Sequence, residues 1–194
     1  MPMPFHHVAI TTRDLAATHA FYTGAMGFTL LRVEVGETPE SVLDPGGSAT
    51  DAAPRGWARH VFYDCGGGEC LAVWELHDPA HLPDEFDPSI SRGLGLPSWT
   101  NHLAFAAPTE VALAEHRDRW LTHGLAVVEV DHGWCRSIYV DDPNGITVEF
   151  CYTTGPVADP DAMAHLADPA PPLGPPPPVA LHLPDPGAAS AGVA

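Results

Sequence analysis

The sequence predicts an α+β protein built from two copies of one βαβββ unit, followed by a proline-rich tail. Two strand-like openings, at residues 5–10 and 100–105, each carry a histidine in an apolar run. Each opening is followed by a helical pattern of apolar residues and then by three further strand-like runs. With 194 residues in all, the chain has room for one domain of two such units.

The first copy spans about residues 5–77. Its helix is expected over residues 14–26, where apolar residues recur at helical spacing and Gly24 and Gly27 supply stop signals. Its remaining strands are expected at about 28–35, 59–64 and 70–77, where short apolar and β-branched runs lie between turn residues.

The second copy spans about residues 100–152. A helix is expected over residues 109–123, with Gly124 as its C-terminal stop. Strands are expected at about 125–130, 135–140 and 146–152, the last two joined by a turn at Asp142-Pro143-Asn144-Gly145.

Three segments fall outside this repeat. A linker over residues 78–99 and an insertion over 36–56 are long enough to act as binding loops or to be surface decoration. Residues 155–194 contain eleven prolines, which remove backbone donors and fix φ. We therefore expect the folded domain to end at about residue 154 and the tail to be disordered or polyproline II.

Composition excludes several classes of partner. The chain carries 25 acidic residues against 8 basic ones, all arginine, for a formal net charge of −17. Nucleic-acid binding and anionic membranes both require basic surfaces, so neither partner is expected. The first residues contain no basic region followed by an apolar stretch, so no signal peptide is expected, and no apolar run is long enough to span a membrane. Four cysteines without a C-x-x-C pair suggest free thiols in a cytoplasmic protein.

Four polar residues occupy similar places in the two copies. His7 and His102 open the two units, whereas Glu75 and Glu149 lie in the closing strands. Side chains alternate along a strand, so all four are able to face one inner surface. A carboxylate in an apolar run requires a partner or a metal when it is buried. Two histidines and one carboxylate suit Fe(II), and four N/O ligands also accommodate Zn, Ni, Co or Mn.

These features resemble the vicinal oxygen chelate superfamily, which includes glyoxalase I, extradiol dioxygenases, methylmalonyl-CoA epimerase and antibiotic resistance proteins. The resemblance implies that the two modules pair their sheets into a cup around one divalent metal, with His7, His102 and Glu149 as ligands. A homodimer is also implied. The resemblance covers residues 5–152 and is carried in the first module by His7-Val8-Ala9-Ile10, Asp14-Leu15, Phe21-Tyr22 and Gly27-Phe28.

Within this superfamily, the second module resembles the extradiol ring-cleaving enzymes. The resemblance implies that Tyr139 hydrogen-bonds a bound catecholate and that His132 acts as acid–base toward substrate and O2. It thus implies an Fe(II) dioxygenase acting on a catecholic or similar bidentate small molecule. The residues that fit the extradiol signature are His132, Ile138, Tyr139, Asp142, Pro143, Gly145 and Glu149.

Two other functions remain open. If Glu75 is a fourth metal ligand, as the resemblance to glyoxalase I and the epimerase implies, proton-transfer chemistry with Zn, Ni or Co becomes the better interpretation. The protein is then a lyase or isomerase. A third possibility is a binding protein that sequesters an antibiotic, although such relatives usually lack the ligands that this chain retains.

Overall fold

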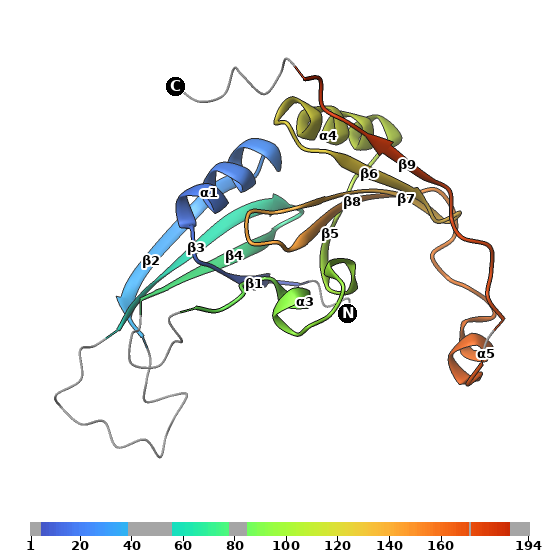
Figure 1. The fold of residues 1–194 in the computed structure, drawn as a ribbon, viewed down its shortest axis with the longest axis horizontal. Helices are drawn as coiled ribbons and strands as arrows, with labels where there is room; N and C mark the ends of the chain where they lie inside the picture. The colour runs from blue at the N-terminus through green and yellow to red at the C-terminus, as the bar shows by residue number, and fades with distance from the viewer. Residues whose placement is uncertain (1–4, 39–55, 78–84, 171, 187–194) are drawn as a thin grey trace. The chain divides into compact units, whose positions relative to one another are not determined.

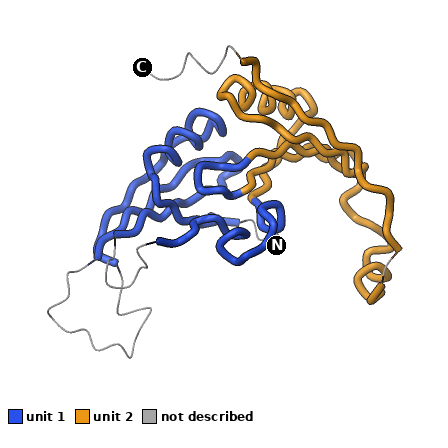
Figure 2. The backbone as a smooth tube through the Cα atoms, in the orientation of Figure 1, with its two compact units in different colours: residues 1–102, 141–146 blue, residues 103–140, 147–194 orange. Residues whose placement is uncertain are grey.

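The computed structural model describes residues 5–38, 56–77, 85–170 and 172–186 (Figure 1). The chain divides into two compact units (Figure 2). Unit 1 comprises residues 1–102 and 141–146, and unit 2 comprises residues 103–140 and 147–194. Parts of the predicted insertion and linker, residues 39–55 and 78–84, lie outside the described residues.

Unit 1 is a four-stranded mixed sheet in the order β1-β4-β3-β2, with β1 parallel to β4. Its helix α1 begins after Asp14, whose side chain accepts a hydrogen bond from the Ala17 amide at 2.9 Å. The predicted helix over 14–26 is therefore present, but its second half is π-helical. The elements of unit 1 are β1 (His7–Thr12), α1 (Leu15–Ala20), the π-helical turn Phe21–Ala25, β2 (Thr29–Glu37), β3 (Trp57–Gly66), β4 (Glu69–His77), α3 (Ile90–Gly93) and the 3₁₀ turn Ser98–Thr100.

Unit 2 repeats this topology in the order β5-β8-β7-β6 and adds β9 beside β6. Helix α4 begins after Thr109, whose hydroxyl accepts from the Ala112 amide at 3.0 Å, and it gives way to Gly124 at φ +77°. The predicted βαβββ repeat is thus confirmed in the strand order. The elements of this half are β5 (His102–Ala106), α4 (Glu110–Thr122), β6 (Val127–Asp131), β7 (Cys135–Asp141), β8 (Thr147–Thr153), α5 (Ala162–Ala167) and β9 (Val179–His182).

Each unit buries its own apolar core between helix and sheet. In unit 1, Tyr22 of the helical segment packs against Tyr63 of β3 and Phe28, while Leu71 and Val73 of β4 are fully buried. In unit 2, the most deeply buried side chains come from α4 and from strands β6 to β8. These residues are Trp120, Val127, Ile138 and Val148.

The C-terminal tail is more regular than its composition predicts. Residues 162–167 form α5, and Val179–His182 pairs antiparallel with β6 as β9 (Figure 1). The expectation of a tail without regular structure is therefore wrong for these segments. The physical reason is local: the proline run ends at Pro178, so all four residues of β9 keep their backbone amides for the ladder.

Candidate functional site

His7 begins β1 on the face of the first sheet that points away from α1. Its register partner in β4 is Cys70. Its ring lies 5.6 Å from that of Phe62 and 6.2 Å from that of His60, both in β3. His60 in turn stacks on Trp74 at 3.7 Å. This face therefore presents two imidazoles within an aromatic surface.

Glu75 lies on the opposite face of the same sheet. It pairs with Thr12 of β1 and Arg59 of β3, five positions further along β4 than the partner of His7. Since neighbouring strand residues alternate between faces, the odd-numbered Glu75 shares the α1 face with Leu71 and Val73. Its carboxylate is held there by Arg59 Nη1 at 3.1 Å and by His77 Nε2 at 3.4 Å.

This register corrects the expectation that the four polar residues face one surface. Five residues along a strand correspond to about 17 Å, and the two side chains point to opposite sides. Glu75 is therefore not placed to share a metal ion with His7. The apolar runs around Glu75 and Glu149 look alike, but a difference in register of one residue reverses the face of a side chain.

His102 begins β5, directly after the 3₁₀ turn. Its Nδ1 lies 3.0 Å from the carbonyl oxygen of Trp99. Metal-binding histidines commonly donate one ring N–H to a backbone carbonyl, which fixes the tautomer and leaves the other nitrogen for the metal. The contact with Trp99 orients the His102 ring in this way.

Glu149 lies on the face of the second sheet that points away from α4. Its neighbour Phe150 stacks on His116 at 3.7 Å and packs against Trp120, both in α4, so the alternate residue Glu149 points to the other side. The residue is only 5% exposed. A carboxylate this deeply buried requires compensation by hydrogen bonds, cations or a metal.

Tyr139 lies on this same face of the second sheet, since Ile138 lines the space under α4. Its hydroxyl is 3.0 Å from Nε2 of His132. Burial raises the pKa of Tyr139 to about 12, opposed by a hydrogen bond with Ser137 and assisted by the nearby charge of Glu149. His132, Tyr139 and Glu149 thus form one contiguous polar group.

The β6–β7 turn places His132 within reach of Tyr139. Asp131 Oδ1 accepts a hydrogen bond from the Gly133 amide at 2.8 Å, and the His132 amide donates to the Cys135 carbonyl at 2.9 Å. Gly133 adopts a φ of +84°, a conformation that favours glycine. A short, well-defined turn therefore returns the chain so that His132 faces the strand that carries Tyr139.

The acidic turn after β7 has a structural role. Asp142 Oδ2 accepts a hydrogen bond from the buried hydroxyl of Tyr22 at 2.9 Å, and its Oδ1 accepts from the amides of Asn144 and Ile146. The Asn144 side chain accepts from Thr12 at 2.7 Å. The signature residues of this turn therefore attach it to the π-helical turn after α1 and to β1, all within unit 1.

The residue types fit a divalent metal of the kind that the sequence predicts. His7 and His102 belong to unit 1, and Glu149 belongs to unit 2. Two imidazoles and one carboxylate are the donors that Fe(II) accepts with positions left for substrate, and the Trp99 contact orients one imidazole as such sites require. Among the described residues, no group of three or more His, Cys, Asp or Glu side chains forms a cluster suited to a metal ion.

Sequence reasoning missed the aromatic surface beside His7. Burial, and then the neighbouring His7, lower the pKa of His60, and its buried Nε2 has no hydrogen-bond partner within the described part of the chain. The alternation of His60 and Phe62 with Val61 and Tyr63 is visible in the sequence. Only the pairing of β3 with β4 shows that these two rings share a face with His7.

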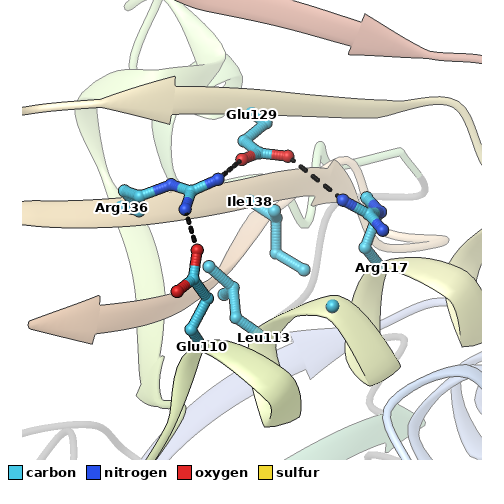
Figure 3. A pocket seen from close by; sticks show the side chains of 7 residues that line it. Glu110, Leu113, Arg117, Glu129, Arg136 and Ile138 are labelled. Atoms are coloured by element: carbon cyan, nitrogen blue, oxygen red, sulfur yellow. Dashed lines mark hydrogen bonds and ion pairs between the residues drawn. The ribbon is translucent and has the colours of Figure 1, made fainter.

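A small cavity of about 80 Å³ lies between α4 and the second sheet (Figure 3). Glu129 is held there by Arg136 Nη2 at 2.7 Å, by His182 Nε2 at 2.9 Å and by Arg117 Nη1 at 3.6 Å, and Arg136 also contacts Glu110. Burial favours a higher pKa for Glu129, but the hydrogen bonds and the charges of Arg136 and His182 together leave the pKa of this carboxyl lowered. These charges compensate one another, so this cavity is a packing feature of the helix-covered face.

Two βαβββ units, each beginning with a histidine, define a two-module α+β protein. The family described as Glyoxalase/Bleomycin resistance protein/Dioxygenase superfamily matches residues 5–150. The chain belongs to this family. Among the described residues, no helix is long and apolar enough to cross a membrane.

Several solved structures are similar to this chain at low sequence identity, and one with a TM-score above 0.5 shares its fold. A glyoxylase/bleomycin resistance protein/dioxygenase domain from Frankia sp. EAN1pec is 19% identical, with a TM-score of 0.52 over 79% of this chain and 99% of that one. A lactoylglutathione lyase from Agrobacterium tumefaciens is 22% identical, with a TM-score of 0.47 over 78% of this chain and 94% of its own. The fosfomycin resistance protein FosX from Listeria monocytogenes is 17% identical, with a TM-score of 0.47 over 79% of this chain and 96% of its own. No curated protein sequence matches the chain.

Proposed function

We propose that this protein is a metal-dependent dioxygenase of the extradiol type that acts on a catecholic or similar bidentate small molecule. His7, His102 and Glu149 are the proposed metal ligands, and Fe(II) is the proposed metal. His132 and Tyr139 are the proposed catalytic residues. Membership of a family that includes dioxygenases supports the general class.

The observation that carries this proposal is the polar group formed by His132, Tyr139 and Glu149. These residues are separate in the sequence, yet the imidazole and the phenol hydroxyl are 3.0 Å apart and the phenol lies next to the carboxylate. The arrangement places a proton donor and an imidazole side by side next to a buried carboxylate. An acid–base pair beside a metal ligand is what ring cleavage requires.

Bound Fe(II) would supply electron transfer between a chelating diol and dioxygen. The side chains of Tyr139 and His132 would hold and transfer the protons. Tyr139 keeps its proton at neutral pH and is able to donate a hydrogen bond to a substrate oxygen. His132, at hydrogen-bond distance from Tyr139, would accept a proton from the substrate hydroxyl and later return it.

The position of Glu75 argues against the four-ligand alternative. A lyase or isomerase of the glyoxalase I kind is the better interpretation if Glu75 is a fourth metal ligand. Glu75 instead points to the α1 face and is paired with Arg59 and His77. Three protein ligands leave more positions for a bidentate substrate and O2.

The test is oxygen uptake by protein loaded anaerobically with Fe(II), using a panel of catechols and recording the coloured ring-fission product. We expect uptake with product for the wild type. Tyr139→Phe and His132→Asn should lower kcat by about 100-fold or more, the range that loss of general acid–base catalysis produces, while leaving iron content unchanged.

Two matched variants control this experiment. Tyr152→Phe removes a hydroxyl on β8, and His165→Asn removes an exposed imidazole in α5, 3.3 Å from Asp159. Both should retain wild-type turnover. Full iron content without uptake on any catechol would overturn the proposal, as would equal activity of the Tyr139→Phe and Tyr152→Phe variants.

A further inference from the structure

Strand β9 places its large apolar side chains on the open face of the second sheet. Ala180 lies opposite Glu129, which lines the space under α4, and His182 contacts the same carboxylate at 2.9 Å. Val179 and Leu181 alternate with these residues, so they point away from α4, and they are 64% and 63% exposed. A sheet that packs on a helix favours the reverse order, with large apolar side chains inside and small or polar ones outside. Core packing therefore does not explain the apolar side chains of β9.

Contacts at both ends of β9 fix the face that each side chain occupies. The amide of Asp131 in β6 donates a hydrogen bond to the carbonyl oxygen of Pro178 at 3.0 Å. The contact of His182 with Glu129 holds the other end of the strand. A slip of one residue would break both contacts and would turn every side chain of β9 to the opposite face. The open-face position of the two apolar residues is therefore a property of this register.

Two rows of side chains connect β9 to Tyr139, the proposed catalytic tyrosine. Directly opposed residues of antiparallel strands share one face of the sheet. Tyr139 of β7 lies opposite Val128 of β6, which in turn lies opposite Leu181 of β9. The apolar side chains of β9 and the tyrosine hydroxyl therefore belong to one continuous surface. The second row, in the same strand order, consists of Ser137, Val130 and Val179.

The aliphatic side chains of the two rows form an apolar strip beside the polar group of His132, Tyr139 and Glu149. Val128 is 37% exposed and Val130 is half-buried, so the strip is open across both β6 and β9. Small-molecule sites are lined mainly by apolar side chains, with a few polar groups that orient the ligand. None of the residues in the two rows carries a charge, so a charged group on a ligand would have no partner there. The apolar strip consists of Val128, Val130, Val179 and Leu181.

We propose that the apolar strip binds an uncharged alkyl or aryl substituent of the substrate, while Tyr139 contacts a substrate oxygen. Two strand spacings separate Tyr139 from Leu181, about 10 Å, which a catechol ring bearing a short alkyl chain or a second ring spans. Continuity with the tyrosine favours a substrate group over a protein partner as the occupant. The inference rests on the proposed dioxygenase function and names its substrate class. Val179 and Leu181 are then specificity-determining residues from the tail, outside the residues 5–150 that match the family.

The test compares an apolar substrate with an unsubstituted and a charged one. With protein loaded anaerobically with Fe(II), oxygen uptake gives kcat/KM for catechol, butylcatechol and carboxycatechol. We expect the wild type to favour butylcatechol over the other two. Leu181→Thr keeps a strand-forming residue but removes apolar surface, so the ratio of kcat/KM for butylcatechol to that for catechol should fall about tenfold. A defect in folding or metal binding would lower both values and leave their ratio unchanged.

Two matched variants control this experiment. Leu173→Thr makes the same change at a tail residue that is 97% exposed and lies outside the sheet. Ala180→Ser adds a hydroxyl to β9 itself, on the face toward α4. Both variants should keep the wild-type ratio.

The outcomes separate this inference from the proposed function. Turnover with the same ratio in Leu181→Thr and Leu173→Thr would overturn the inference and leave the dioxygenase function standing, as would a wild type that prefers carboxycatechol. If Leu181→Thr changed the sedimentation of the protein but not this ratio, another copy of the chain would cover the strip, which also overturns the inference.

A lack of turnover on every catechol would instead contradict the proposed function. Anaerobic equilibrium dialysis of butylcatechol then decides the inference. The apolar strip requires binding by Leu181→Thr to be about tenfold weaker than binding by Leu173→Thr. Equal binding by the two variants would overturn it.

Discussion

The closing strands of the two sheets each carry a glutamate, but the two residues have opposite surroundings. Glu75 of β4 points to the helix-covered face and is paired with an arginine and a histidine. Glu149 of β8 points away from its helix and lies beside Tyr139. The two glutamates therefore differ although their apolar runs are similar. The carboxylate of Glu75 forms ion pairs, whereas that of Glu149 lies beside a candidate catalytic residue.

The difference shows that residues at similar places in two sequence repeats do not always occupy equivalent positions in the two sheets. On β4, the face of His7 is occupied by even-numbered residues such as Cys70 and Ala72. The register of the ladder, rather than similarity of the runs, decides which polar groups meet. Comparing the two carboxylates experimentally is therefore the sharpest way to examine the site.

The largest expected effect separates these two glutamates. Glu149→Gln should weaken metal binding by more than the ten- to 100-fold that loss of an outer partner costs. Glu75→Gln should keep metal content and turnover within a few-fold of wild type. Metal analysis after dialysis against a weak chelator measures both, with thermal unfolding as the control. Equal loss in both variants would mean that Glu75 contributes to the site.

The charge network under α4 is expected to matter for the second sheet. Glu129 is mostly buried and compensates two arginines and a histidine. Glu129→Gln should lower the free energy of unfolding by about 2 kcal/mol, because the arginines lose their shared counter-charge. Urea denaturation measures this change. The exposed ion pair of Arg32 with Glu34 in the first sheet offers a matched control: Glu34→Gln should cost under about 1 kcal/mol.

Removal of β9 should have a smaller effect. Truncation after residue 178 removes the β6–β9 ladder and the contact of His182 with Glu129, and we expect a loss of roughly 1 kcal/mol. The loss is modest because Val179 and Leu181 are more than 60% exposed. Truncation after residue 186, which keeps β9, is the control. Indistinguishable urea midpoints for the two truncations would contradict a stabilising role for β9.

Lowering the pH should destabilise the second unit through the buried imidazole of His116. Burial, assisted by the charge of Arg119, lowers the pKa of this imidazole to about 4. Between about 4 and 6.5 the unfolded chain takes up a proton that the folded chain does not, so stability falls as pH falls through this window. In the His116→Gln variant, the free energy of unfolding should fall by about 1 kcal/mol less over this window than in the wild type. This value is reduced because the imidazole is partly exposed. Thermal unfolding from pH 7 to pH 4.5 would show an unchanged slope if the imidazole were not responsible.

Much of the fold could be predicted because local patterns were strong. Thr109 and Gly124 bound α4 as expected, and the apolar runs gave the strands to within a few residues. For the candidate site, the sequence singled out His132 and Tyr139, and the structure brings these two residues to hydrogen-bond distance. The turn between β6 and β7 is short, so few backbone conformations would keep His132 and Tyr139 apart.

The parts that could not be predicted depend on pairing between distant segments. The face of Glu75 follows from the β1–β4 register, which nothing in either strand alone encodes. The aromatic surface at His60 and Trp74 follows from the β3–β4 register. The strand at Val179–His182 could not be predicted from composition, because its four residues without proline directly follow a proline run.

The late position of β9 has a consequence for synthesis of the chain on the ribosome. Strand β6 is made well before β9, with α5 and the proline run between them. The nascent second unit therefore completes its helix and its first four strands while the β6 edge is still open. The last strand of the sheet closes this edge only after the proline-rich segment has emerged, so the exposure of the edge during translation is set by the length of the tail.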